Sequence, residues 1–188
     1  ATHASAEEVD KEIRAQLDRA VTLGIPITHL DTHMGTLYAK PEYTEAYVKL
    51  GIEKHIPIMI MGGHLQFIGE DEQDIVKQLQ ITQLAEKVWQ GGLPVLDDLL
   101  NRTYGWKTFD EKKANLLKAL GEMRPGLTMV IFHCAQPTDE WEHFTTSSET
   151  RTNDLKLMTD PDVKKFLEDG KFIQTTFREL MERRKAAK

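Results

Sequence analysis

Short apolar runs alternate with longer helical stretches along this chain, and this alternation constrains the fold more than any other feature. The runs expected to form strands are residues 25–33, 56–61, 93–96, 127–132 and 171–175. Segments of helix length, rather than two-residue turns, separate them. Because parallel strands need a long crossover between them, the sequence predicts an α/β fold with a parallel-stranded sheet. An open doubly wound sheet and a segment of a (β/α) barrel both satisfy this pattern.

Capping signals mark where the intervening helices begin. Ser5 with Glu8, and Thr108 with Glu111, have the spacing of capping boxes, and Pro161 suits the first position of a helix. The helices expected from these signals and from the apolar spacing are residues 5–24, 41–55, 71–90, 108–120 and 160–170, with one more after residue 175.

Length and composition indicate an ordinary globular chain. With 188 residues, 40% of them hydrophobic and 29% charged, a single domain spanning residues 1–188 is expected. The formal net charge of −6 argues against a nucleic-acid partner, because a phosphate-binding surface would normally bring a basic excess.

The compartment is constrained by one cysteine and by the lack of long apolar runs. Cys134 cannot form an internal disulfide, which fits a reducing compartment. No apolar run approaches the roughly 20 residues that cross a bilayer, and the first residues do not resemble a signal peptide. We therefore expect a cytoplasmic protein with no membrane partner. Because the chain does not start with Met, export of a processed form stays open.

Three metal-competent side chains alternate along the first predicted strand. His29, Asp31 and His33 would project to one face, because residues i, i+2 and i+4 of a strand do so. At about 3.3 Å per residue, the outer two are roughly 13 Å apart, too far for all three to share one ion without a bend. His33 lies nearest the carboxyl end of the strand, where ligands gather in parallel α/β folds.

These positions suggest two alternative roles. His33 could bind zinc or another divalent metal, while Asp31 orients it or helps to hold a substrate. Alternatively, the segment contains an internal hydrogen-bonded pair and one surface histidine, because polar residues on a buried strand need partners.

Other candidate residues follow later strands. His133 comes directly after residues 127–132, which would place it at the same rim as His33, where it could act as a general acid. His64 follows Gly62 and Gly63, and it is either part of that rim or a loop histidine. For Cys134 we expect an inert, buried thiol, since nothing nearby lowers its pKa.

Residues 28–33, Thr-His-Leu-Asp-Thr-His, resemble the Thr-His-Leu-Asp-Ser-His signature of the YdjC-like carbohydrate deacetylases. The strand entering His133 and Cys134 resembles the late His-Pro strand end of that family. Residues 151–180 resemble its closing segment. The resemblance covers nearly the whole chain and is most specific at residues 29–33.

The resemblance implies a (β/α) barrel-like fold and a divalent metal ion, Mg or Zn. His33 matches a metal ligand of the family, and Asp31 and His133 are the candidate catalytic residues. The two other family ligands, an Asp in an Asp-Asp-Phe-Gly segment and a later His, have no counterpart here. We therefore expect the carboxy-terminal portion of an incomplete barrel lacking its amino-terminal strands, whose uncovered edge favours association, for example as a homodimer.

The function expected from the resemblance is hydrolysis by a metal-dependent enzyme that removes acetyl groups from N-acetylated oligosaccharides. The sequence departs from the family where Met34-Gly35-Thr36 replaces further histidines and where Cys134 replaces a proline. These departures keep two alternatives open. One is an inactive sugar-binding relative, and the other is a metal-dependent phosphoesterase or isomerase on a similar barrel.

Overall fold

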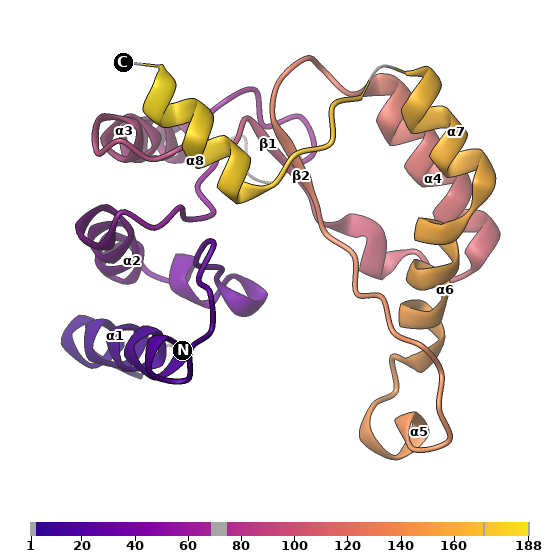
Figure 1. Cartoon of the computed structure of the whole chain (residues 1–188), viewed down its shortest axis with the longest axis horizontal. Coiled ribbons are helices and arrows are strands. Elements are labelled where there is room, and N and C mark those ends of the chain that lie inside the picture. The colour runs from indigo at the N-terminus through magenta and orange to yellow at the C-terminus, as the bar shows by residue number, and fades with distance from the viewer. Residues whose placement is uncertain (1–2, 69–74, 171, 188) are drawn as a thin grey trace. The chain divides into compact units, whose positions relative to one another are not determined.

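The computed structural model describes residues 3–68, 75–170 and 172–187, and these form two compact units that alternate along the chain. The first unit takes in the described residues of Ala1–Gly62, Asp74–Leu96 and Thr175–Lys188. The second takes in those of Gly63–Gln73 and Asp97–Gln174. Figure 1 shows their elements with the labels used below. The expectation of one domain over residues 1–188 stays a prediction.

The first unit is built mainly from helices. They are α1 (Ala6–Thr22), the 3-10 helix η1 (His33–Tyr38), α2 (Pro41–Lys54), α3 (Ile75–Gln90) and α8 (Phe177–Ala186). The predicted capping box at the start of α1 is confirmed, since Ser5 Oγ accepts from Glu8 N and Glu8 Oε2 accepts from Ser5 N. Helix α1 packs against α2 in this unit.

Among the described residues of the first unit, parallel pairing is confined to single bridges. Leu30 pairs with Ile58, and Met61 pairs with Leu96, both in parallel. The prediction of full strands at residues 25–33, 56–61 and 93–96 is therefore wrong in extent. Each of these runs contains a proline, which has no N–H to donate to a ladder; the three are Pro26, Pro57 and Pro94.

Apolar side chains from the bridged segments and helices form the core of the first unit. The core residues are Tyr47, Val48, Ile58, Ile60, Ala85, Val88, Leu93 and Met181. Because Tyr47 carries a hydroxyl into this core, that group requires hydrogen-bond partners there.

The second unit contains the two named strands. They are β1 (Asp98–Leu100) and β2 (Thr128–Val130), paired in parallel with Leu99 opposite Met129. The helical elements are η3 (Arg102–Gly105), α4 (Phe109–Glu122), α5 (Trp141–Phe144), α6 (Ser148–Thr159) and α7 (Pro161–Asp169). Asp160 caps α7 by accepting from Asp162 N and Val163 N, which confirms the predicted start of this helix.

A second hydrophobic core lies between these helices and strands. Its buried members are Leu100, Leu116, Leu120, Leu157 and Val163. Helix α4 packs against α6 and α7 in this unit. The strand predicted at residues 171–175 is absent over residues 172–175, and Lys171 lies outside the described residues.

The predicted α/β class with a small parallel sheet is confirmed, although the chain is mostly helical. Closure into a barrel, and the incomplete barrel expected from the resemblance, stay predictions. Over residues 3–68, 75–170 and 172–187, no helix combines the length and the apolar sequence that a bilayer crossing requires.

Replacement of Tyr47 by Phe should destabilise the protein while leaving its core filled. The variant leaves Leu30 O without its side-chain donor and Met59 N without its acceptor, both at a ring that is 1% exposed. A loss of about 1 to 3 kcal/mol in the free energy of unfolding is expected, measured by urea titration. An unchanged midpoint of the urea titration would show that these hydrogen bonds do not contribute to the stability of the fold.

Candidate functional site

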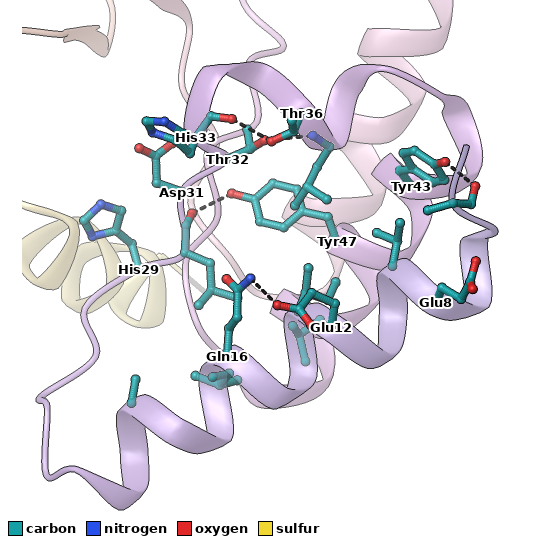
Figure 2. Close-up of a pocket in the computed structure, with 18 of the residues that line it drawn as sticks. Glu8, Glu12, Gln16, His29, Asp31, Thr32, His33, Thr36, Tyr43 and Tyr47 are labelled. Atoms are coloured by element: carbon teal, nitrogen blue, oxygen red, sulfur yellow. Dashed lines mark hydrogen bonds between the residues drawn. The ribbon is translucent and has the colours of Figure 1, made fainter. Parts of the chain in front are cut away.

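A cavity of about 880 Å³ opens in the first unit beside the segment that carries the candidate ligands. Its lining comes from α1, from residues 27–33, from η1 and from α2, as Figure 2 shows. His29, Asp31 and His33 all belong to this lining. Cavities of roughly 300 to 1,000 Å³ accommodate small organic ligands, so the space is large enough for a ligand of that class.

The segment is held at Leu30, between His29 and Asp31. Leu30 N donates to Pro57 O at 2.9 Å, and the Tyr47 hydroxyl donates to Leu30 O at 2.5 Å. The same hydroxyl accepts from Met59 N at 2.9 Å. Burial raises the pKa of the Tyr47 phenol well above its usual range, so this group stays protonated and remains a donor.

His29 is held by contacts within the protein. Its ring stacks on Phe177, with centroids 4.3 Å apart and planes inclined by 14°, and its Nδ1 lies 2.8 Å from Thr28 Oγ1. Burial lowers the pKa of His29, and the nearby Asp31 carboxylate opposes this shift. These contacts favour a packed, neutral imidazole at this position.

Asp31 and His33 are exposed at the cavity, whereas Thr32 between them is buried. Figure 2 draws both side chains at the same end of the cavity. Thr32 Oγ1 accepts from Leu37 N at 2.9 Å, which ties the segment to η1. His33 begins η1, and Thr36 Oγ1 donates to its carbonyl oxygen at 2.6 Å. A carboxylate and an imidazole thus share the cavity without being buried in it.

These two side chains suit a divalent cation in part. An imidazole and a carboxylate are both zinc ligands, and His33 and Asp31 are accessible from the cavity. A catalytic zinc site uses three protein ligands. Within the described residues, no group of three or more His, Cys, Asp or Glu side chains is arranged to hold an ion. His33 therefore fits as one member of a ligand set that needs others.

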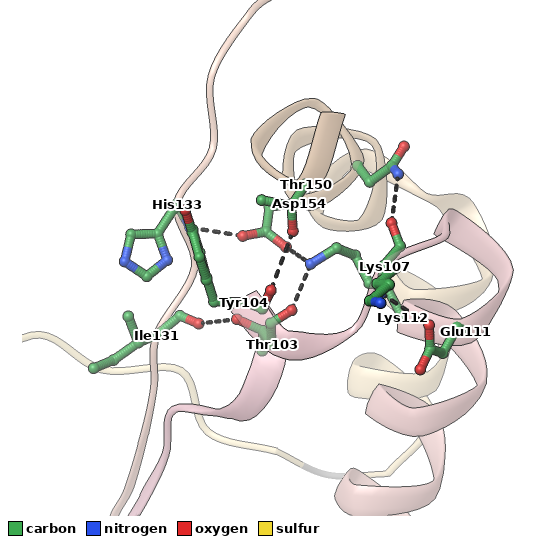
Figure 3. Close-up of polar contacts among 10 residues, drawn as sticks. Thr103, Tyr104, Lys107, Glu111, Lys112, Ile131, His133, Thr150 and Asp154 are labelled. Atoms are coloured by element: carbon green, nitrogen blue, oxygen red, sulfur yellow. Dashed lines mark hydrogen bonds and ion pairs between the residues drawn. The ribbon is translucent and has the colours of Figure 1, made fainter. Parts of the chain in front are cut away.

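His133 lies in the second unit, directly beyond β2. Its backbone N donates to Asp154 Oδ2 at 2.9 Å, and its half-buried ring meets the edge of Tyr104 with centroids 5.1 Å apart. Figure 3 shows these contacts. Because His33 belongs to the first unit and His133 to the second, their predicted location at one rim stays a prediction.

A buried ion pair beside His133 was not anticipated from the sequence. Lys112 on α4 and Asp154 on α6 are both fully buried, with Nζ 2.7 Å from Oδ1. The sequence does contain a pattern that indicates such a pair. Lys112 precedes Leu116 and Leu120 at four-residue spacing, so it lies on the buried face of α4. A lysine on that face needs an anionic or carbonyl partner.

His64 lies in a loop of the second unit, close to a buried carboxylate. Its Nδ1 lies 3.4 Å from Oδ2 of the fully buried Asp98, which also accepts from Phe67 N and Leu99 N. Gly63 approaches Asp97 so closely that a Cβ would lie 2.3 Å from its Oδ1. The glycine leaves room for the Asp97 carboxylate, and neither ring nitrogen of His64 makes a hydrogen bond among the described residues.

Cys134 is exposed, so the expectation of a buried thiol is wrong. Partial desolvation raises the pKa of this thiol, and the negative charge of Asp154 adds to the rise. Because the thiolate is the reactive form, these surroundings disfavour a nucleophilic role.

The curated proteins that this chain resembles in sequence share the name carbohydrate deacetylase. The model of the YdjC-like protein family matches residues 1–169. Carbohydrate deacetylases of Thermoanaerobacter pseudethanolicus and Thermus thermophilus are 25% identical over 175 residues and 28% identical over 179. These alignments cover 93% and 95% of this chain but 60% and 62% of the relatives. The chain thus spans about three fifths of the length of these curated relatives.

One solved structure is similar in fold. It is a proposed cellobiose-phosphate cleavage protein of Enterococcus faecalis, with a TM-score of 0.71 over 94% of this chain and 62% of that one. At 16% sequence identity, the likeness supports the α/β fold alone.

The titration of His29 tests its packed environment. Its pKa should lie below 6.5, the ordinary value, and Asp31→Asn should lower it further by removing the opposing carboxylate. Because the unfolded state then binds the proton more tightly, His29 stabilises the fold above about pH 6.5 and this contribution is lost as the pH falls. Histidine NMR signals followed against pH, in the presence of a chelator, measure both shifts. A pKa above 6.5 would contradict the packed arrangement.

Proposed function

The chain belongs to the YdjC-like protein family, and on that premise we propose that it acts in a metal-dependent carbohydrate deacetylase, a hydrolase that removes acetyl groups from N-acetylated oligosaccharides. The observation that carries the proposal is the exposure of Asp31 and His33 at one cavity, within the segment that matches the family signature. The names of the curated relatives support the same reaction class.

His33 is the proposed metal ligand of this segment. Its imidazole suits zinc, and the proposed metal ion is Zn or Mg. When bound, a divalent cation polarises the amide carbonyl and lowers the pKa of a coordinated water. Asp31, exposed beside His33, would orient that imidazole or accept a hydrogen bond from a sugar hydroxyl.

His133 is the proposed general acid. Breaking an amide bond releases an amine, which is a poor leaving group until its nitrogen is protonated. An imidazolium can supply that proton near neutral pH.

A binding protein without turnover is the second candidate, and one observation favours it. Met34 and Gly35, directly after His33, both adopt left-handed backbone conformations, with φ of 53° and 66°. Met34 is also 88% exposed. A reshaped turn at this point would alter the surroundings of His33, so binding of chitooligosaccharides without acetate release would select this candidate. A phosphoesterase would instead release phosphate from a phosphorylated sugar.

Removal of the metal or of His33 should abolish deacetylation. Loss of a residue that merely supports a ligand costs about 10-fold to 100-fold, so His33→Ala should lower kcat/KM by at least about 100-fold. Acetate release from N-acetylchitooligosaccharides is the assay, run on full-length protein that supplies the remaining metal ligands, with added Zn²⁺ or Mg²⁺ and after chelation. His55→Asn is the matched control, because His55 is an exposed histidine outside the cavity lining, in a left-handed conformation that Asn tolerates. Equal activity in chelated and metal-loaded protein would refute metal dependence.

The role of His133 predicts a dependence on the leaving group. His133→Gln should lower the hydrolysis of an N-acetyl sugar by about 100-fold to 10,000-fold. The same variant should hydrolyse an activated aryl acetate at a rate much closer to that of the wild type, because that leaving group needs no proton. Equal losses on both substrates would contradict the general-acid role.

A further inference from the structure

Two opposite charges are removed from water in the second unit at a point next to His133. Lys112 and Asp154 are each 0% exposed, and their ion pair spans 2.7 Å. Removing two charges from water carries a large desolvation cost, and apolar residues of similar volume are often as stabilising or more so. Stability alone therefore gives little reason for this pair, and its other bonds indicate what it does.

Both members of the pair bond to the backbone near His133. Asp154 Oδ1 accepts from Lys112 Nζ, while Oδ2 of the same carboxylate accepts from His133 N at 2.9 Å. Lys112 Nζ also donates to Thr103 O at 2.5 Å. Figure 3 shows the carboxylate between the ammonium group and the strand end that carries His133.

The bond to Thr103 acts on a second segment near the imidazole. Thr103 belongs to η3, and its Oγ1 donates to Ile131 O at 2.6 Å, two residues before His133. The next residue, Tyr104, meets the imidazole edge-on, with ring planes inclined by 69°. One ion pair thus fixes the backbone of His133 and also the turn that carries the ring packed against it.

We propose that Asp154, neutralised by its ion pair with Lys112, is a positioning residue that sets the direction in which the His133 imidazole leaves the segment beyond β2. Neither touches the imidazole in the described contacts, so neither is a catalytic residue. The catalytic meaning of this positioning rests on the proposed deacetylase function. The physical basis is that a displacement of about 1 Å in an acid can cost about 100-fold in rate.

Two double variants separate positioning from stability. Lys112→Met with Asp154→Leu replaces the ion pair by apolar residues and removes the acceptor of His133 N–H. Lys112→Met with Asp154→Asn also removes both charges but keeps a side-chain oxygen that can accept from His133 N–H. The two double variants therefore differ mainly in whether residue 154 offers an acceptor to His133 N–H.

The Leu variant should lose about 100-fold in kcat on an N-acetylchitooligosaccharide, with little change in KM, whereas the Asn variant should recover most of the rate. Both variants should unfold cooperatively in urea. Equal kcat in the two folded variants would overturn the positioning role, because a purely structural pair would not depend on the acceptor. Lys113→Met is the matched control, since this neighbouring lysine pairs with Asp160 and Asp162 at the surface. It should leave kcat unchanged.

NMR of the His133 amide and imidazole separates failure of the inference from failure of the deacetylase function. In the wild type, the His133 amide should be protected from hydrogen exchange, and absence of protection would overturn the inference without any variant. In the Leu variant the imidazole signals should move, while the Asn variant should resemble the wild type. If the wild type releases no acetate but these shifts occur, the deacetylase proposal fails and the positioning stands. If the imidazole signals stay unchanged in the Leu variant, the positioning fails whatever the activity.

Discussion

The hydroxyl of Tyr47 is the contact on which the candidate ligand segment depends. It joins Leu30 O to Met59 N inside the first core, at the single parallel bridge that pairs Leu30 with Ile58. A regular strand would hold His33 through a ladder of backbone hydrogen bonds. Here the bridge at Leu30 and the Tyr47 hydroxyl hold the start of the segment, and the side chains of Thr32 and Thr36 tie Asp31 and His33 to η1.

In the second unit, charged side chains hold the segment that carries the candidate histidine. Beyond β2 the backbone of His133 bonds to the Asp154 carboxylate, which Lys112 neutralises inside the core. In both units a buried polar side chain on a helix reaches an extended segment close to a candidate histidine. Such bonds are stronger in a low-dielectric interior and costly to break, which makes them suited to fixing a site at the end of a short strand.

Local signals in the sequence predicted helix starts better than strand lengths. The capping bonds at Ser5 and Asp160 depend only on neighbouring residues, so their spacing could be read directly. Strand extent depends on partners far along the chain, and apolar composition did not reveal that prolines such as Pro57 would leave only isolated bridges. His33 could be singled out because its segment is distinctive. Asp154 could not, because its partner lies 42 residues earlier in the sequence.

The central claim is that His33 binds a catalytic metal ion at the cavity of the first unit. A crystal of the protein loaded with Zn²⁺, with anomalous diffraction measured at the zinc edge, tests it most directly. The predicted result is an anomalous peak at about 2.0 to 2.1 Å from a ring nitrogen of His33. A zinc peak bound elsewhere, with the His33 imidazole uncoordinated, would contradict it.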